Sequence, residues 1–341
     1  MTPARFDALI ARFRTLRLGV VGDFSLDRYF DIDPARAEKS LETGLPVHNV
    51  TRVRCQPGAA GNIVQNLAAL SPAALWPVGY CGDDGEGFEL RRALRRLGGM
   101  QLDHFLQPPT RLTFTYTKPL VHTPGQPPKE LARLDIKNWT PTPATVESAL
   151  IASLQHLAPQ LDALIVMDQA AAPGAGVVSR GVLAAVAAIA RAHPPLVIMA
   201  DSRHGLTTYP PLCFKMNAAE FALLTGRSDS PAELFDHIPG GATELAQRNG
   251  RPVFITLAER GMIGAAPGGR AVHVPALPVH GPIDIVGAGD TVTAMLTLAL
   301  TAGANLREAM ELAQAAASVV VHQLGTTGTA TPLQLQRKLF P

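Results

Sequence analysis

The stretch 284–291 combines small residues with two carboxylates and leads into an apolar segment. Its sequence is Asp-Ile-Val-Gly-Ala-Gly-Asp-Thr, and the segment from Val292 to Leu300 is expected to form a helix. Small residues at Gly287, Ala288 and Gly289 leave backbone N–H groups open at the start of that helix. Such groups, together with the helix dipole, bind negative charge, for example on a phosphoryl group in transfer.

The carboxylate of Asp290 directly follows this turn. In that place it can accept the proton of an attacking hydroxyl, while the amides of Ala288, Gly289 and Asp290 offset charge that develops on the phosphoryl oxygens. The alternative is a tight turn in which Asp290 is an ordinary helix cap, and a four-residue match taken alone is more often of that kind. The rest of the chain must decide between the two.

Polar residues follow several apolar runs that are typical of buried strands. The expected strands cover 18–21, 163–167, 196–200, 214–216 and 253–257. In an open parallel sheet, ligands bind beyond the carboxyl ends of the strands. The polar residues in that position are Asp23, Asp168, Asp201, Asn217 and Glu259.

From residue 145 onward the strands alternate with helical segments, which predicts an α/β fold with a central, mostly parallel sheet flanked by helices. The segments 29–54 and 112–135 differ, because short apolar and polar stretches alternate there between Pro and Gly breakers. We expect these two segments to form strands outside the main sheet, as a small β-lid. Residues 1–341 would then form a single domain with that lid.

Composition excludes several classes of protein. The 341 residues are 47% hydrophobic and 17% charged, with a formal net charge of +2, so we expect a globular protein without the basic excess of a nucleic-acid binder. The apolar runs are shorter than the roughly 20 residues needed to cross a bilayer, so no membrane segment is expected. Three scattered cysteines favour a reducing compartment, and we expect a cytoplasmic protein.

Three motifs in the same order resemble the PfkB, or ribokinase-like, family of carbohydrate kinases. They are the opening from Gly22 to Asp27, the stretch Pro57-Gly-Ala-Ala-Gly-Asn62, and the segment 284–291. The resemblance covers nearly the whole chain and implies a ribokinase-like fold. It also implies that Asp290 is the catalytic base and that Gly287, Ala288 and Gly289 form the anion hole. The cofactors it implies are ATP and the Mg²⁺ that ATP carries, since the ten histidines show no metal-binding spacing.

Two further elements resemble the nucleotide site of the family. Asn217 and Glu220 are similar to its Asn-x-x-Glu element, which helps to place magnesium and phosphates. Thr256, Glu259 and Gly261 belong to a strand and turn that resemble the one holding the nucleotide phosphates. The simpler alternatives are a helix start for the first pair and a hairpin turn for the second set.

For the sugar, the resemblance points to Asp27, Gly58, Asn62 and Asp168, whose side chains would hydrogen-bond hydroxyl groups. Asn62 and Asp27 could instead cap a helix and bind loop amides. Arg133, at the end of the expected lid, could bind a phosphate already present on the substrate, although exposed arginines are usually only solvated.

Within the family, the likeness is greatest to the kinase domains of heptose-phosphate kinases. It lies in Gly22–Tyr29, in Leu45-Pro46-Val47 and in Ala315–Gly325. The acceptor would thus be a sugar or sugar phosphate, with heptose phosphates among the candidates. Two departures from the family pattern leave the acceptor open: Ala59 stands where a glycine is common, and Asp168 precedes Gln169 instead of tyrosine.

Alternatives to a sugar kinase are a nucleoside kinase of the same fold and a non-catalytic relative that binds sugar or nucleotide. The latter would most simply show a changed Asp290 or a filled glycine turn, and neither is present. The resemblance further suggests a monovalent cation, such as K⁺, near Asp284. It also suggests a homodimer formed through the lid strands, which would protect their edges.

Overall fold

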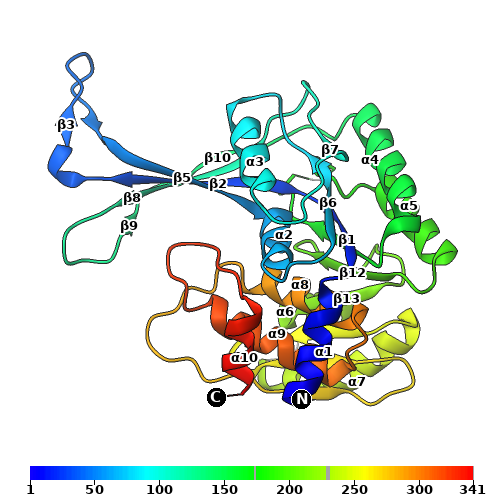
Figure 1. The fold of residues 1–341 in the computed structure, drawn as a ribbon. Coiled ribbons are helices and arrows are strands. Elements are labelled where there is room, and N and C mark those ends of the chain that lie inside the picture. The colour runs from blue at the N-terminus through cyan, green and yellow to red at the C-terminus, as the bar shows by residue number, and fades with distance from the viewer. Residues whose placement is uncertain (173, 228–230, 341) are drawn as a thin grey trace.

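The computed structural model describes residues 1–172, 174–227 and 231–340, and its main element is a nine-stranded sheet (Figure 1). The strand order is β16-β15-β14-β13-β12-β11-β1-β6-β7. Neighbouring strands run parallel except for the pairs β14–β15 and β15–β16. The strands are β1 (Arg17–Gly22), β6 (Ala74–Tyr80), β7 (Phe105–Leu106), β11 (Ala163–Asp168), β12 (Val197–Ser202), β13 (Cys213–Asn217), β14 (Val253–Thr256), β15 (Met262–Ala265) and β16 (Val272–Val274).

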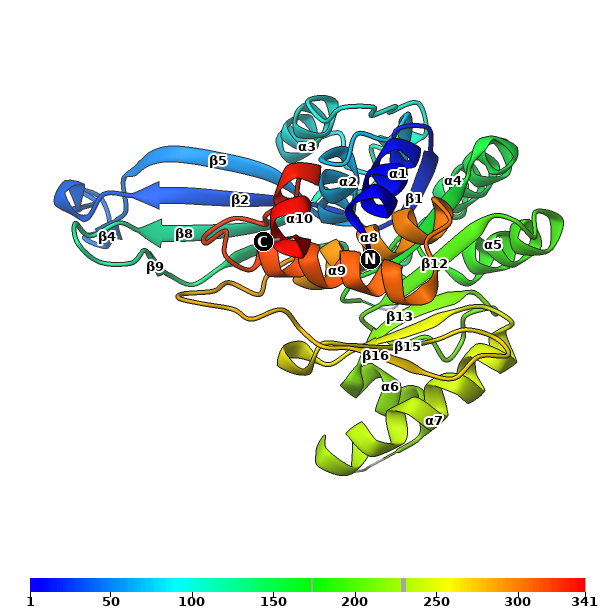
Figure 2. The same cartoon turned by 60° about the horizontal axis from the view of Figure 1, so that its bottom comes forward.

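Helices cover both faces of this sheet, and each face has its own apolar core (Figures 1 and 2). One face packs against α1 (Pro3–Phe13), α2 (Ala60–Ala68), α3 (Gly85–Arg95), α8 (Ala288–Thr301), α9 (Leu306–Val320) and α10 (Pro332–Leu339). The other face packs against α4 (Ala144–Leu157), α5 (Arg180–Ala192), α6 (Ala218–Thr225) and α7 (Pro231–Asn249). Because both faces are covered, the central strands are apolar along most of their length. The expected α/β fold with a mostly parallel, helix-flanked sheet is confirmed.

A second, five-stranded sheet projects from the body (Figure 1). Its order is β10-β8-β2-β5, and β9 pairs with β8. A short hairpin of β3 and β4 lies near its tip. The strands are β2 (Phe24–Ile32), β3 (Glu38–Lys39), β4 (Pro46–Val47), β5 (Val50–Ala59), β8 (Phe114–Val121), β9 (Lys129–Glu130) and β10 (Leu134–Ile136).

The strands of the projecting sheet reach further into the body than the segment 29–54 suggested. β2 follows β1 after Asp23 alone, and β5 continues to Ala59, where α2 begins at the next residue. Gly22 is the last residue of β1, and the pair Pro57-Gly58 lies within β5 without ending it, so pattern alone could not fix the junction. The consequence is that the roots of the two longest lid strands lie beside the carboxyl ends of the main sheet.

Three short 3₁₀ helices complete the described structure: η1 (Pro34–Arg36), η2 (Ala158–Gln160) and η3 (Ala258–Arg260). Within the ranges described above, no helix is both long and apolar enough to span a bilayer.

Candidate active site

The N-terminus of α8 presents open backbone donors. Gly287, the residue before the helix, has φ +82°, a conformation that favours glycine, and no side chain caps the helix. The N–H of Ala288 donates to the carbonyl of Ile285 at 3.2 Å. The expectation that this amide binds phosphoryl oxygens is therefore wrong, because the amide is already hydrogen-bonded. The N–H groups of Gly289 and Asp290 have no acceptor among the described residues. These two amides are therefore the donors available to an anion.

Asp290 is buried in the first turn of α8 but does not cap that helix. Its Oδ2 accepts a hydrogen bond from Nδ2 of Asn62 at 2.9 Å. Burial raises the pKa of Asp290 to about 7, against the opposing effects of the Asn62 bond and the Lys215 charge. A carboxylate whose pKa lies near neutrality is well suited to take a proton from a hydroxyl.

Asn62 is held beside Asp290 by α2. The residue before this helix is Ala59, with φ +55°, and no side chain caps the helix, so Asn62 is not a cap. Instead, α2 packs directly against α8. Sequence position alone could not bring these two residues together, because 227 residues lie between them and only the helix packing joins them.

Asp27 lies at the root of β2, opposite β5 of the lid. A Cβ atom at Gly58 would lie 2.5 Å from Oδ1 of Asp27, so only glycine leaves room for this carboxylate. Nζ of Lys118 approaches Oδ2 of Asp27 at 3.6 Å. Burial raises the pKa of Asp27, and the Lys118 charge opposes that rise. Gly58 and Asp27 are thus in contact, and Asp27 acts on Asp290 through its charge.

Asp168, one of the residues predicted to bind the sugar, is the last residue of β11, and its carboxylate accepts two hydrogen bonds. Its Oδ2 accepts hydrogen bonds from Oγ of Ser202 at 3.0 Å and from Oη of Tyr209 at 3.2 Å. Burial is the main reason that the pKa of Asp168 is raised. Both partners belong to the body, and no hydrogen bond among the described residues joins Asp168 to Asp27 or Asn62.

Asp23 holds the backbone that follows Asp168. Its carboxylate accepts hydrogen bonds from the N–H groups of Gln169, Ala170 and Val177, each at 2.7 Å. Burial raises the pKa of Asp23 to about 6, although these three bonds favour the charged form. The role of Asp23 is therefore to position the loop that follows Asp168.

Arg133 lies on the lid, where it forms two hydrogen bonds with the Asp135 carboxylate, at 2.7 and 2.9 Å. Its guanidinium lies 5.0 Å from the ring centre of Tyr116. Lys137 also pairs with Asp135, at 3.1 Å, so two cations share one carboxylate. Glu130 also acts on Arg133 through its charge, so Asp135 is not the sole counter-charge of these two cations.

A cavity of about 1170 Å³ begins at the open end of α8. Ala288 and Gly289 line it, together with three of the residues predicted to bind nucleotide phosphates, Thr256, Glu259 and Gly261. Gly261 has φ +91°, and a Cβ atom there would lie 2.2 Å from the carbonyl oxygen of Val274, so the turn requires glycine. The apolar part of the wall includes Leu223, Phe235, Leu257, Leu277, Val279, Ile283, Ile285 and Val321.

Asn217 and Glu220 form the capping box of α6. The Asn217 side chain accepts from the Glu220 N–H at 2.9 Å, and the Glu220 carboxylate accepts from the Asn217 N–H at 2.8 Å. The helix-start alternative thus applies to both residues. Asn217 also lines the cavity, and burial raises the pKa of Glu220. One role does not exclude the other, because a carboxylate has further lone pairs.

Asp284 lies on the loop before α8. Its N–H donates to the carbonyl of Val321 at 2.8 Å, and its Oδ1 accepts from the Val286 N–H at 3.0 Å. The first bond joins the loop to the end of α9, and the second lies within the loop.

Lys215, a residue that the sequence patterns did not single out, lies beneath the open turn of α8. Its Nζ donates to Oδ2 of Asp201 at 2.8 Å, and both side chains are buried. Oγ1 of Thr293 donates to the same oxygen at 2.7 Å. The sequence did carry one signal for Lys215, because it is the only charged residue within the apolar stretch 213–216. A charge buried in a strand requires a partner of opposite charge.

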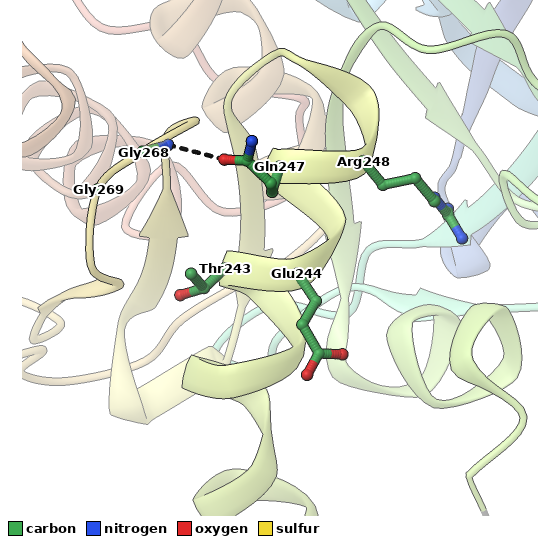
Figure 3. A pocket seen from close by; sticks show the side chains of 6 residues that line it. All are labelled: Thr243, Glu244, Gln247, Arg248, Gly268 and Gly269. Carbon is green, nitrogen blue, oxygen red and sulfur yellow. Dashed lines mark hydrogen bonds between the residues drawn. The ribbon is translucent and has the colours of Figure 1, made fainter.

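A second, shallower hollow lies away from this site, between the end of α7 and the turn from β15 to β16 (Figure 3). Figure 3 shows Gln247 pointing toward Gly268, whose N–H donates to Oε1 of Gln247 at 3.0 Å, while Arg248 points away. The residues that line this hollow include none of the predicted site residues.

Comparisons with known proteins bear on the family of this chain. The family described as pfkB family carbohydrate kinase matches residues 24–332. The bifunctional protein HldE of Azorhizobium caulinodans is 31% identical over 320 residues, which cover 93% of this chain and 63% of that protein. HldE of Pectobacterium atrosepticum is 33% identical over 333 residues, which cover 96% and 64%. The chain therefore spans a little under two thirds of the length of these two relatives.

Solved structures share the fold. Arabidopsis thaliana ribokinase, complexed with ribose and ATP, has a TM-score of 0.66 at 19% identity, with 96% of this chain and 99% of that chain covered. Phosphofructokinase-2 of Escherichia coli, in complex with substrates and products, has a TM-score of 0.70 at 17% identity, with 94% and 98% covered. The ribokinase-like fold expected from the sequence motifs is confirmed.

Proposed function

The chain belongs to the pfkB family of carbohydrate kinases, and from that premise we propose that it transfers the γ-phosphoryl group of ATP to a hydroxyl of a sugar or sugar phosphate. The observation that carries the proposal is the position of Asp290. This buried carboxylate, with a pKa of about 7, is held by Asn62 beside the free amides at the start of α8. A base and an anion site next to one another are what transfer to a hydroxyl requires.

In the proposed reaction, Asp290 accepts the proton of the acceptor hydroxyl as its oxygen attacks the γ-phosphorus. The bond from that phosphorus to the bridging oxygen of ADP breaks, and the electron pair leaves with ADP. The amides of Gly289 and Asp290 stabilise the charge on the transferred oxygens. Gly287 and Ala288 give the turn the shape that keeps these amides open.

The donor nucleotide would occupy the cavity beside α8. A volume of about 1170 Å³ with a mainly apolar wall suits a base and ribose, and the turn with Thr256, Glu259 and Gly261 would contact the phosphates. Asn217 and Glu220 would hold magnesium through their oxygen atoms, which are the ligands that this ion prefers. Bound magnesium neutralises phosphate charge.

The acceptor would bind between the lid and the body, near Asp27, Gly58, Asn62 and Asp168. A phosphorylated sugar is favoured over a plain one, because the lid presents two cations, Arg133 and Lys137, whose N–H groups can bind a phosphate. The sequence likeness to heptose-phosphate kinases suggests a heptose phosphate.

The decisive experiment is a screen for acceptor-dependent ADP formation with heptose phosphates, hexose phosphates, pentoses and nucleosides. We expect the highest kcat/KM with a sugar phosphate, and a loss of at least tenfold in kcat/KM when its phosphate is removed. A preference for nucleosides would identify a nucleoside kinase, and the absence of turnover with every acceptor would favour a non-catalytic relative.

Residues 1–341 would act as a single kinase domain with a lid, and two such domains would pair through their lids. β5 is an edge strand of the lid sheet, and Val50 and Val53 on it are exposed, which is costly unless a partner covers them. A single species of monomer mass at micromolar concentration would contradict the dimer.

Asp284 is the proposed contact of a monovalent cation, since the bond from Val286 uses Oδ1 and leaves Oδ2 available. Activity that is equal in K⁺ and in a large organic cation would contradict this assignment. Cys55, Cys81 and Cys213 are free thiols, as a cytoplasmic protein would keep them. Cell fractionation checks that location.

A further inference from the structure

Lys215 places a buried positive charge next to the phosphoryl-transfer site. It lies on β13, two residues before the strand ends, and only 7% of the residue is exposed. Burial disfavours the charged ammonium, but the attraction of Asp201 outweighs burial and raises the pKa of Lys215. The side chain is therefore charged at neutral pH.

The ammonium group lies against the turn that begins α8. A Cβ atom built at Gly289 would lie 3.2 Å from Nζ of Lys215, which is closer than most such contacts. Gly289 also lines the cavity assigned to the nucleotide. Glycine at this position therefore lets the ammonium approach the same backbone that presents the free amides of Gly289 and Asp290.

Lys215 has hydrogen-bonding capacity to spare. An ammonium group carries three protons, and within the described part of the chain its one hydrogen-bond acceptor is Oδ2 of Asp201. Asp201 in turn receives the Thr293 hydroxyl. Two N–H groups of Lys215 thus remain for a ligand at the turn, while Asp201 fixes the direction of the side chain.

A purely structural role explains these contacts less well. The Lys215–Asp201 pair does join β13 to β12, and Thr293 joins α8 to β12 through the same carboxylate. However, a buried ion pair is often no more stabilising than apolar residues of the same size. A fixed positive charge beside developing negative charge is, by contrast, among the largest contributions to catalysis.

We propose that Lys215 is a catalytic residue whose ammonium group contacts the transferred phosphoryl group, and that Asp201 is the residue that positions it. The proposal rests on the proposed kinase function. In the reaction described above, Lys215 makes and breaks no covalent bond and keeps its proton. It neutralises charge on the phosphoryl oxygens from its place against Gly289, at the start of α8.

Three variants separate this role from a structural one: Lys215→Met, Asp201→Asn and the double variant Lys215→Met/Asp201→Asn. Lys215→Met leaves Asp201 buried without its ion-pair partner, so loss of stability accompanies any effect on catalysis. The double variant removes both charges and is expected to melt closer to the parent than Lys215→Met does. Its kcat should nevertheless stay about 100-fold or more below the parent, as for the loss of one transition-state donor.

A binding measurement supplies a readout that needs no acceptor. Calorimetry with MgADP and with the magnesium complex of a non-hydrolysable ATP analogue compares nucleotides that differ in the γ-phosphate. In the double variant we expect the affinity for the analogue to fall at least tenfold, while the affinity for MgADP changes less than threefold.

Recovery of kcat to within threefold of the parent in the double variant, or an equal change in both affinities, would overturn the role of Lys215. Such results leave the kinase function of the parent intact. If the parent binds neither nucleotide, the proposed function itself fails, and the role of Lys215 fails with it.

Discussion

Asp290 owes its suitability as a base to its neighbours as much as to its motif. Burial alone would push its pKa further up and leave it protonated at neutral pH. The Asn62 hydrogen bond and the Lys215 charge lower the pKa again, while Asp201 and Asp27 raise it. Four side chains from four elements thus set the pKa of Asp290, and a substitution at any of them should shift that pKa.

Replacing Asp290 by Asn tests the base directly. The amide has nearly the same size but cannot accept the proton, so kcat should fall by about 100- to 10,000-fold. Nucleotide affinity should remain within a few-fold, because the backbone amides are unchanged. Turnover, calorimetric affinity and thermal melting are measured on the same preparation. Asp7→Asn, an exposed change on α1, is the control. A loss below tenfold for Asp290→Asn would contradict the assignment.

The pH dependence of stability tests the environment of Asp290 without any substrate. Its pKa is about 7 in the folded protein and near 3.8 when exposed, so between these values the folded state binds more protons than the unfolded state. The contribution of this residue to the free energy of unfolding is therefore fully present below the lower value and is lost as pH rises through the upper one.

Asp290→Asn removes this dependence. The variant should melt several degrees above the parent at about pH 8 and close to the parent at about pH 4. In the parent, kcat/KM should decline on the acid side with an apparent pKa of about 7. Equal melting temperatures of parent and variant at the higher pH would mean that the charged Asp290 carboxylate does not destabilise the folded protein.

At the scale of elements, local sequence patterns predicted most strands of the main sheet. They could not predict side-chain contacts between segments that are distant in the sequence. The apolar runs near residues 163, 214 and 253 became β11, β13 and β14 within one or two residues. Lys215 beside Gly289 could not be foreseen in this way, because that contact depends on how α8 packs on the sheet. Asn62 beside Asp290 is similar, since the family motif suggested both residues but only helix packing joins them.

The turn between β14 and β15 offers a test of the nucleotide cavity. At Gly261, a methyl group would meet the backbone of Val274 at 2.2 Å, so Gly261→Ala must displace the cavity wall. We expect the affinity for ATP to fall at least tenfold, measured by calorimetry.

A matched change in the same sheet separates this effect from backbone strain. Gly268 has φ +72° and nothing within 4 Å of a Cβ atom, so Gly268→Ala adds strain of about 1 kcal/mol without a clash. Both variants should lose stability, but only Gly261→Ala should lose affinity. If both bind ATP like the parent, the phosphates do not lie at the predicted turn.

At the scale of the whole molecule, hydrogen bonds connect the lid to the loop that follows α9. Nε2 of Gln56 on β5 donates to Oγ1 of Thr327 at 2.6 Å, and Oγ1 of Thr326 donates to Oε1 of Gln56 at 2.9 Å. Thr327 also lies against Gly287, where an added Cβ would meet its methyl group at 3.3 Å. One loop thus touches both the lid and the turn that presents the free amides.

This arrangement predicts that the lid contacts keep water from taking the phosphoryl group. A closed site favours transfer to the acceptor over hydrolysis. In the parent, ADP formation should therefore be slow without an acceptor and should match the phosphorylated product when the acceptor is present. Gln56→Ala removes both bonds that the Gln56 side chain makes to the loop and leaves the bond from Arg54 to the Gly325 carbonyl, at 3.3 Å. It should therefore raise ADP formation without acceptor and yield more ADP than phosphorylated product. The test measures both products in the same reaction.

Asn49→Ala is the matched control for this variant. The Asn49 amide also donates two hydrogen bonds, to the carbonyl of Arg36 and to the Glu38 carboxylate, but both lie within the outer part of the lid. If the contact with the loop matters, only Gln56→Ala should uncouple ADP formation from transfer. Equal ratios of the two products in parent, control and Gln56→Ala would mean that this contact does not close the site. Equal ADP formation by the parent with and without acceptor would mean that the lid does not gate the reaction at all.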